Sequence, residues 1–309
     1  MQSRVSKVIY KSLKNIIQPY NSNTDYVKVR QDLENLARLQ NINRKVELTC
    51  IPLENCTMEM VSVPEAPKDK IIMYIHGGGF TTGGIVTSRK FITEFCLRAK
   101  LNAVSCDYRL APENAFPAPL DDCVAMYEHL LSMGYNSQNI VLLGESAGGT
   151  LTLALTLLLK DNNKPLPAAI CSMCPVGDMT GTLDSRERNV KVEALLRYDL
   201  DEKIRMAYVN DYDVCDPYIS PIYGNYENFP PLLLQLGEYE ILYDDSVLLY
   251  EIAKKKGVDV TLSVWDKMWH GFQIIWGMPE SKLAHKEIIE FFHKHLGYDE
   301  YDEFRKKYD

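Results

Sequence analysis

The chain lacks a hydrophobic run long enough to cross a membrane, and it has no surplus of basic residues. No apolar stretch in the 309 residues approaches the roughly 18 that a membrane-spanning helix needs. Residues 1–18 carry spaced basic side chains without a continuous apolar core, which is not the pattern of a secretory signal. Acidic residues outnumber basic ones by 42 to 34, and the net charge of −8 disfavours nucleic-acid binding. We expect a cytoplasmic protein without stable membrane insertion.

The sequence also lacks the paired ligands of a structural metal site. Its eight cysteines are scattered, and without a secretory signal they should stay reduced. Cys171 and Cys174 have C-x-x-C spacing, but no second ligand pair stands at a distance suited to zinc. A redox motif would open a helix, whereas Pro175 and Gly177 follow this pair at once. We therefore expect buried structural cysteines, no metal and no organic cofactor.

What the chain does have is the rhythm of an α/β protein. Strand and helix patterns alternate from residue 71 to residue 296, which predicts a mostly parallel sheet with helices on both faces. The first two of about eight expected strands read as an antiparallel hairpin. The expected strands are 46–51, 56–63, 71–75, 101–106, 139–143, 167–173, 232–236 and 260–265. The expected helices between and after them are 88–100, 120–133, 147–159, 245–256 and 281–296.

Two segments stand outside this alternation. Residues 4–17 have a helical apolar stripe, and a second helix is expected over about 24–40. The stripe of the first helix consists of Val5, Val8, Ile9, Leu13, Ile16 and Ile17, and that of the second of Val29, Leu33 and Leu36. The first helix is basic and suits either a membrane surface or docking on its own protein, and we favour docking.

The second of these segments is charged and helix-prone. It predicts helices over 186–197 and 200–209 and contains no strand pattern. We expect one domain spanning 1–309, with lid segments at about 1–45 and 178–215. The core of this domain then comprises about 46–177 and 216–296.

One pentapeptide, Gly144-Glu145-Ser146-Ala147-Gly148, joins a strand pattern to a helix pattern. Strand, G-x-S-x-G and helix together are the context of a nucleophile elbow, where the serine stands exposed on a strained turn. The pentapeptide alone is a weak signal, because ordinary glycine usage of about 7% produces it often by chance. Other parts of the chain must therefore supply a base, an acid and oxyanion donors.

Candidate donors follow the strand 71–75. His76-Gly77-Gly78-Gly79 leaves backbone N–H groups uncovered, and such HGGG loops form oxyanion holes in lipases and esterases. The N–H of Ala147, at the start of the helix after the serine, is expected to be a further donor. His76 itself is expected to be structural.

Among six histidines, only one other than His76 lies outside a predicted helix. His270 follows the strand ending at Trp265, and active sites of parallel sheets form beyond the carboxyl ends of strands. We expect His270 to be the base. The histidines on predicted helices are expected to be solvated or locally bonded; they are His129, His285, His293 and His295.

The acid should follow the preceding strand, which ends at Leu236. Asp244 and Asp245 stand where a helix cap and first turn belong, which already explains them. Glu238 and Glu240 lie nearer the strand end, and position alone leaves both open.

Several motifs resemble those of the hormone-sensitive-lipase-like esterases of the α/β-hydrolase superfamily, over most of residues 60–296. The motifs are His76–Gly79, Asp107–Glu113, Phe116–Ala118, Gly144–Gly149, Asp216–Pro221 and His270–Phe272. The resemblance implies Ser146 as nucleophile and His270 as base, with oxyanion N–H groups from Gly77, Gly78 and Ala147. The acid of this family lies in Asp-x-Leu-x-Asp, which here reads Glu240-Ile-Leu-Tyr-Asp, so Glu240 takes the acid position and Glu238 is the next choice.

The resemblance implies a serine carboxylesterase with an α/β-hydrolase fold, a helical lid from the N-terminus and an insertion after strand six. We expect small-molecule esters with short acyl groups as substrates and water as the second substrate. The same site would also suit an amidase, a deacetylase or a lactonase. A non-catalytic ligand-binding relative is disfavoured, because the serine, acid and histidine are all present. Family members often form homodimers.

Overall fold

In the part of the chain that the structure describes, eight strands form one mostly parallel sheet, as the alternation predicted, and their order is β1-β2-β4-β3-β5-β6-β7-β8. The computed structural model describes residues 2–16 and 25–298. The two pairings at the β1 edge are antiparallel and the other five are parallel. The strands are β1 (Glu47–Pro52), β2 (Thr57–Ser62), β3 (Ile71–Ile75), β4 (Asn102–Cys106), β5 (Ile140–Glu145), β6 (Ala169–Met173), β7 (Leu232–Gly237) and β8 (Val260–Trp265).

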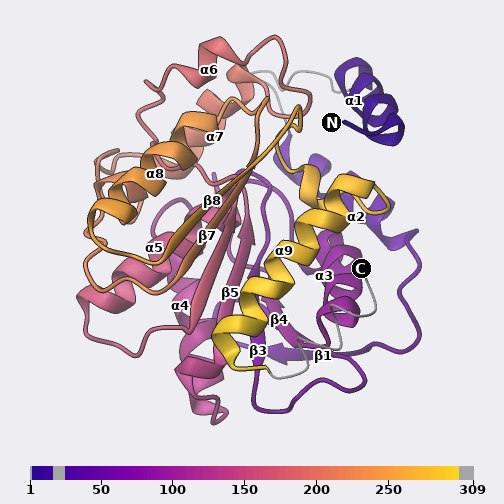
Figure 1. The fold of residues 1–309 in the computed structure, drawn as a ribbon, viewed down its shortest axis with the longest axis vertical. Coiled ribbons are helices and arrows are strands. Elements are labelled where there is room, and N and C mark those ends of the chain that lie inside the picture. The colour runs from indigo at the N-terminus through magenta and orange to yellow at the C-terminus, as the bar shows by residue number, and fades with distance from the viewer. Residues whose placement is uncertain (1, 17–24, 299–309) are drawn as a thin grey trace.

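Helices cover both faces of the sheet (Figure 1). One face packs against α4 (Ala118–Ser132), α5 (Ala147–Asp161) and α8 (Tyr243–Lys255). The other packs against α3 (Ile85–Ala99) and α9 (Pro279–Leu296). Because successive side chains of a strand point to opposite faces, the apolar run of β3 feeds both layers, and every one of its residues is buried.

The carboxyl ends of the parallel strands meet at one edge of the sheet. Ile75 at the end of β3 pairs with Gly144 of β5, and Gly237 at the end of β7 pairs with Trp265 of β8. The loops that follow β3, β5, β7 and β8 therefore converge, which is where a parallel α/β sheet places its ligands.

The expected helix over 186–197 is wrong. The structure has only the short α6 (Ser185–Arg188), followed by turns, whereas α7 (Tyr198–Val209) agrees with the second expected helix. The chain leaves the helix because polar side chains of residues 189–193 bind backbone groups elsewhere, including the Glu240 carbonyl, which accepts from the Asn189 amide at 2.8 Å. We call residues 185–196 the strap.

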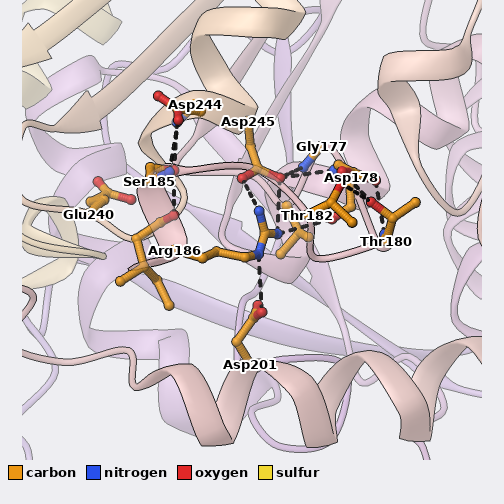
Figure 2. Close-up of polar contacts among 12 residues, drawn as sticks. Gly177, Asp178, Thr180, Thr182, Ser185, Arg186, Asp201, Glu240, Asp244 and Asp245 are labelled. Atoms are coloured by element: carbon orange, nitrogen blue, oxygen red, sulfur yellow. Dashed lines mark hydrogen bonds and ion pairs between the residues drawn. The ribbon is translucent and has the colours of Figure 1, made fainter. Parts of the chain in front are cut away.

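A buried ion-pair network anchors the strap (Figure 2). The Arg186 guanidinium is fully buried and donates to Asp245 at 2.8 Å and to Asp201 at 3.2 Å. Asp245 also accepts the backbone N–H groups of Gly177 and Asp178. Although Asp245 stands in the first turn of α8, as expected, its main contacts tie that helix to the strap.

The first helix, α1 (Arg4–Ile16), docks on the protein, as favoured, but only part of its expected stripe makes the contact. Val5 and Val8 are exposed, while Ile9, Tyr10 and Leu13 pack against an apolar cluster around Trp269. Other anchors are polar, because Ser3 and Ser6 donate hydrogen bonds to the Glu280 carboxylate. Within residues 2–16 and 25–298, no helix has the length and apolarity needed to cross a membrane.

The second helix, α2 (Tyr26–Arg38), contains no buried residue, so its expected apolar stripe does not form a core contact. Arg30 holds it instead, donating to the carbonyls of Thr81 and Ala111 at 2.7 Å each and to the Glu113 carboxylate. This arginine therefore fixes α2 to the segment that follows the glycine loop. Ile17 of the expected first stripe lies outside the described residues.

Two of the histidines expected to be solvated or locally bonded are hydrogen-bonded inside the protein. His285 and His293 are buried on α9, where their Nε2 atoms lie 2.7 Å from the Gln273 carbonyl and 2.8 Å from the Ala99 carbonyl. Burial lowers the pKa of His285 to about 4. These rings thus join α9 to neighbouring segments and take no part in the cluster around the serine.

Candidate active site

Ser146 occupies a strained turn between β5 and α5. Its φ is 55° and its ψ −124°, in a region that side-chain-bearing residues rarely adopt. A Cβ at Gly144 would lie 2.3 Å from the Gly148 carbonyl oxygen, and one at Gly148 would lie 2.0 Å from the Ile75 carbonyl oxygen. Both glycines are therefore sterically required, and the turn has the geometry of a nucleophile elbow.

The structure brings Ser146, His270 and Glu240 together from three separate loops. The Nε2 atom of His270 lies 2.8 Å from the Ser146 hydroxyl oxygen. Its Nδ1 atom lies 3.0 Å from Glu240 Oε2. His270 and Glu240 are both buried. The three side chains form a continuous hydrogen-bonded chain in the order serine, histidine, acid.

Glu240, rather than Glu238, points into this chain. Glu240 is fully buried, and its Oε1 accepts the N–H of Gly237 at 2.5 Å while Oε2 faces His270. Glu238 is exposed and instead accepts the N–H of Lys267 at 3.0 Å. The longer glutamate side chain fits because it turns back on the start of its own loop, where the Gly237 N–H fixes one oxygen.

The glycine loop differs from the sequence expectation at Gly77. The N–H of Gly77 donates to Glu145 Oε1 at 2.7 Å, so this donor is already occupied and is not free for an oxyanion. Within residues 2–16 and 25–298, no hydrogen bond uses the N–H groups of Gly78, Gly79 or Ala147. The free glycine donors are therefore the second and third of the loop, and the expectation for Gly77 is wrong in this structure.

Glu145, the second residue of the G-x-S-x-G pentapeptide, holds this loop in place. One carboxylate oxygen accepts from Gly77, and the other accepts from the Tyr74 hydroxyl at 2.7 Å. Burial raises the pKa of Glu145 to about 7, although the bonds from Tyr74 and Gly77 oppose the shift. Only its place inside G-x-S-x-G marked this residue, and that pattern carries no requirement for a side chain there.

His76 is structural, as expected. Its Nδ1 lies 2.7 Å from the Gly77 carbonyl, and its ring stacks on Tyr108 with centroids 4.1 Å apart. Burial lowers the pKa of His76 to about 4, which keeps the ring neutral. The His76 ring therefore links the glycine loop to Tyr108.

The electrostatics around His270 favour its protonated form. Burial lowers the pKa of His270, whereas Cys174 and then Glu240 raise it, and the net shift is well upward. Because burial also raises the pKa of Cys174 and so keeps it a thiol, we attribute the upward shift mainly to the Glu240 carboxylate. The Glu240 carboxylate can therefore stabilise the imidazolium that forms when His270 takes the serine proton.

A third buried side chain, that of Cys174, lies beside His270 and Glu240. The ligand-type atoms of Cys174, Glu240 and His270 lie within 4.8 Å of one another. Nδ1 of His270 already forms a hydrogen bond with Glu240, so hydrogen bonding accounts for the way these side chains gather. All eight cysteines are free, and Cys171 and Cys174 are buried, as expected for structural thiols.

A cavity of about 690 Å³ lies beside the glycine loop. Gly77, Gly78 and Glu145 form its wall toward the nucleophile turn, and Leu33 of α2 contributes from the side of the N-terminal segment. Apolar side chains at its rim include Phe91, Ile274, Ile275 and Trp276. Ser146, His270 and Glu240 do not line this cavity, so it is not the space that opens onto the nucleophile.

A nucleophilic-serine elbow with a histidine and a carboxylate beyond the carboxyl ends of a mostly parallel sheet defines the class of α/β-hydrolase-fold enzymes. A family model described as the alpha/beta hydrolase fold matches residues 72–274, and the chain belongs to this family.

Similar proteins narrow the family further. An esterase from Acinetobacter venetianus is 34% identical over 266 residues, which cover 85% of this chain and 87% of the esterase. An acetyl-hydrolase from Streptomyces hygroscopicus is 33% identical over 239 residues, covering 76% of this chain and 78% of that protein. A crystal structure of an esterase from the bacterial hormone-sensitive lipase family has a TM-score of 0.88 and 32% identity, covering 96% of this chain and 99% of that one. The resemblance found in the motifs is thus confirmed.

Proposed function

We propose that the protein is a serine carboxylesterase that hydrolyses short-chain acyl esters through an acyl-enzyme. The observation that carries the proposal is the hydrogen-bonded chain from Ser146 through His270 to Glu240. This arrangement supplies a nucleophile, a base within reach of its proton, and an acid that fixes the tautomer of the base. The relatives named esterase and acetyl-hydrolase support the reaction class.

In the acylation step, the Ser146 oxygen attacks the ester carbonyl carbon while its proton passes to Nε2 of His270. The negative charge that develops on the carbonyl oxygen is met by the N–H groups of Gly78, Gly79 and Ala147. When the tetrahedral intermediate collapses, the leaving alkoxide takes the proton from Nε2 and departs as the alcohol.

Deacylation repeats these steps with water. His270 removes a proton from water, and the resulting hydroxide attacks the acyl carbon under the same N–H groups. The intermediate expels the Ser146 oxygen, which recovers the proton from His270, and the carboxylic acid leaves. No other reactant is needed to balance the two half-reactions.

Replacing the nucleophile tests the reaction. Ser146→Ala is expected to reduce hydrolysis of p-nitrophenyl butyrate to background, because no other group takes the nucleophile's place. The Ser132→Ala enzyme is a matched control, since this hydroxyl is exposed on α4. Wild-type activity in the Ser146→Ala enzyme, with intact circular dichroism, would refute the mechanism.

Short acyl groups are the proposed substrates. The acetyl-hydrolase relative supports this preference. A series of p-nitrophenyl esters from acetate to dodecanoate should show the highest kcat/KM at two to four carbons. Faster hydrolysis of the matching anilides would favour an amidase.

Several further expectations concern the setting of this site. We propose that the segments at about 1–45 and 178–215 form a lid over the core, and their contacts at the active-site edge of the sheet support this. A cytoplasmic location is supported by the free thiols. Light scattering would test whether the protein forms a homodimer.

A further inference from the structure

A second buried carboxylate lies beside His270. Glu193 belongs to the strap and is only 6% exposed. Its Oε1 accepts the N–H groups of Ala194 at 2.7 Å and Leu195 at 2.8 Å. Both of its oxygens also face the backbone N–H of His270, at 3.3 and 3.2 Å. The strap and the histidine loop are 77 residues apart in sequence, so this contact is purely tertiary.

The strap holds the acid loop as well. The side-chain amide of Asn189 donates to the Glu240 carbonyl at 2.8 Å and to the Glu238 carbonyl at 3.1 Å. The Ser185 hydroxyl donates to the Ile241 carbonyl at 2.7 Å. One short segment therefore binds the backbones that carry both Glu240 and His270, and it sets the distance between them.

The charge of Glu193 also bears on the imidazole. Titratable groups that face Glu193 are His270 after β8, Glu240 after β7 and Tyr10 of α1. A carboxylate buried near an imidazole favours the imidazolium form, because the interaction is weakly screened inside the protein. Burial raises the pKa of Glu193 to about 7, so above that pH two carboxylates act on the same ring, one bonded to Nδ1 and one to the backbone N–H.

We infer that Glu193 is a positioning residue for the esterase reaction, holding the His270 loop by hydrogen bonds and supporting the developing imidazolium by its charge. This inference rests on the proposed function. Glu193 does not touch the substrate or the reacting atoms, so its effect must act through His270. Loss of the Glu193 charge should therefore change the basicity of His270 and the kcat of the enzyme, while KM for the ester stays the same.

The N-terminal helix supports this arrangement from outside. The Tyr10 hydroxyl donates to the Val192 carbonyl at 2.8 Å, and Lys14 donates to the Lys191 carbonyl. Tyr10 also packs on Trp269, the residue before the base, with ring centroids 5.7 Å apart. Helix α1 therefore clamps the two segments that meet at Glu193 and His270.

The test compares Glu193→Gln with Glu187→Gln. The glutamine keeps an oxygen that can accept the same N–H groups but removes the charge. Glu187 is exposed on the same strap, so its replacement is a matched control. For each folded enzyme, kcat and KM for p-nitrophenyl butyrate are measured across pH, and the pKa of His270 is followed by NMR of its ring protons.

For Glu193→Gln we expect the plateau kcat to fall about 3- to 10-fold, with KM within about twofold, because a less basic imidazole accepts the serine proton less readily. The acidic limb of the pH profile should move to lower pH, and the pKa of His270 should fall by about one unit. Glu187→Gln should match the wild type in every measurement.

Three results would overturn the inference: an unchanged plateau kcat, an unchanged pKa of His270, or an equal change in Glu187→Gln. If Glu193→Gln does not fold, Glu193→Asp replaces it. That variant keeps the charge while shortening the reach, and we expect a lower kcat with the pKa of His270 nearly unchanged; a wild-type kcat would then refute the role. Because the NMR readout needs no substrate, it stands apart from the esterase activity, which wild-type hydrolysis and its loss in Ser146→Ala test separately.

Discussion

Replacing Glu240 by glutamine should disable the base while leaving the fold almost unchanged. The Gly237 N–H donates to Glu240 Oε1 at 2.5 Å, so the amide oxygen of a glutamine would stay at that position. Its NH₂ group would then occupy the place of Oε2 and face His270 Nδ1. Because an NH₂ group only donates, Nδ1 would have to accept, and the ring proton would move to Nε2.

In that tautomer, Nε2 cannot take the proton of Ser146. For serine enzymes, the wrong tautomer costs about 10⁴-fold in kcat, which corresponds to roughly 5.5 kcal/mol of activation free energy. We therefore expect a loss of about 10³- to 10⁴-fold in kcat for p-nitrophenyl butyrate, measured at saturating substrate, with KM little changed.

Two neighbouring carboxylates provide controls. Glu238→Gln should leave kcat within about twofold, because the Glu238 side chain is exposed and accepts its hydrogen bond from the Lys267 backbone N–H, away from His270. Asp244→Asn should lower the free energy of unfolding by about 1 kcal/mol, since Asp244 accepts the Ser185 N–H and pairs with Arg188 at a partly exposed site. Near-wild-type activity in Glu240→Gln, or a large loss in either control, would show that the acid has been misassigned.

Four further results are expected. Gly78→Ala should lower kcat by at least about 100-fold, because φ is +111° there and a Cβ would lie 2.3 Å from a carbonyl oxygen, displacing an oxyanion donor. Arg186→Met should cost about 3–5 kcal/mol in urea unfolding, because buried Asp245 loses its cation partner while Asp201 keeps Arg205; Arg188→Met should cost at most about 1 kcal/mol. Since the pKa of His270 is raised and its neutral form is the base, kcat/KM should increase with pH through the neutral range. Burial raises the pKa of Glu193 from 4.5 to about 7, so the folded state holds an extra proton between these values and stability falls as pH rises through them; Glu193→Gln should remove up to about 3 kcal/mol of that fall.

The fold and two of the three residues proposed as its catalytic centre, Ser146 and His270, leave strong local signals in the sequence. Apolar runs of five or six residues alternate with helical patterns, and the glycines around Ser146 are forced by the turn they form. His270 was found by its place after the last strand. Glu240 needed the family motif, because nothing local distinguishes it from Glu238.

Other features depend on contacts between distant segments, which no local pattern reports. The glycine loop offers Gly77 as an oxyanion donor, but the Gly77 N–H donates to Glu145, 68 residues later, and no pattern near Gly77 signals that bond. The strap looked helical because its residues are helix-prone, but Asn189 and Glu193 bind the acid and base loops instead. Contacts with residues distant in the sequence therefore determine both the secondary structure of the strap and which N–H groups of the glycine loop stay free.

The strap links the proposed lid segment at about 178–215 to the loops that carry Glu240 and His270. An exchange of residues 178–215 between relatives, made to alter substrate preference, would also exchange the groups that hold the acid and base loops. Grafts that preserve Asn189 and Glu193 should retain turnover, whereas grafts chosen only for cavity shape should bind substrate and react slowly. In this architecture, the evolution of new substrate ranges is constrained to substitutions that leave the grip on the two loops intact.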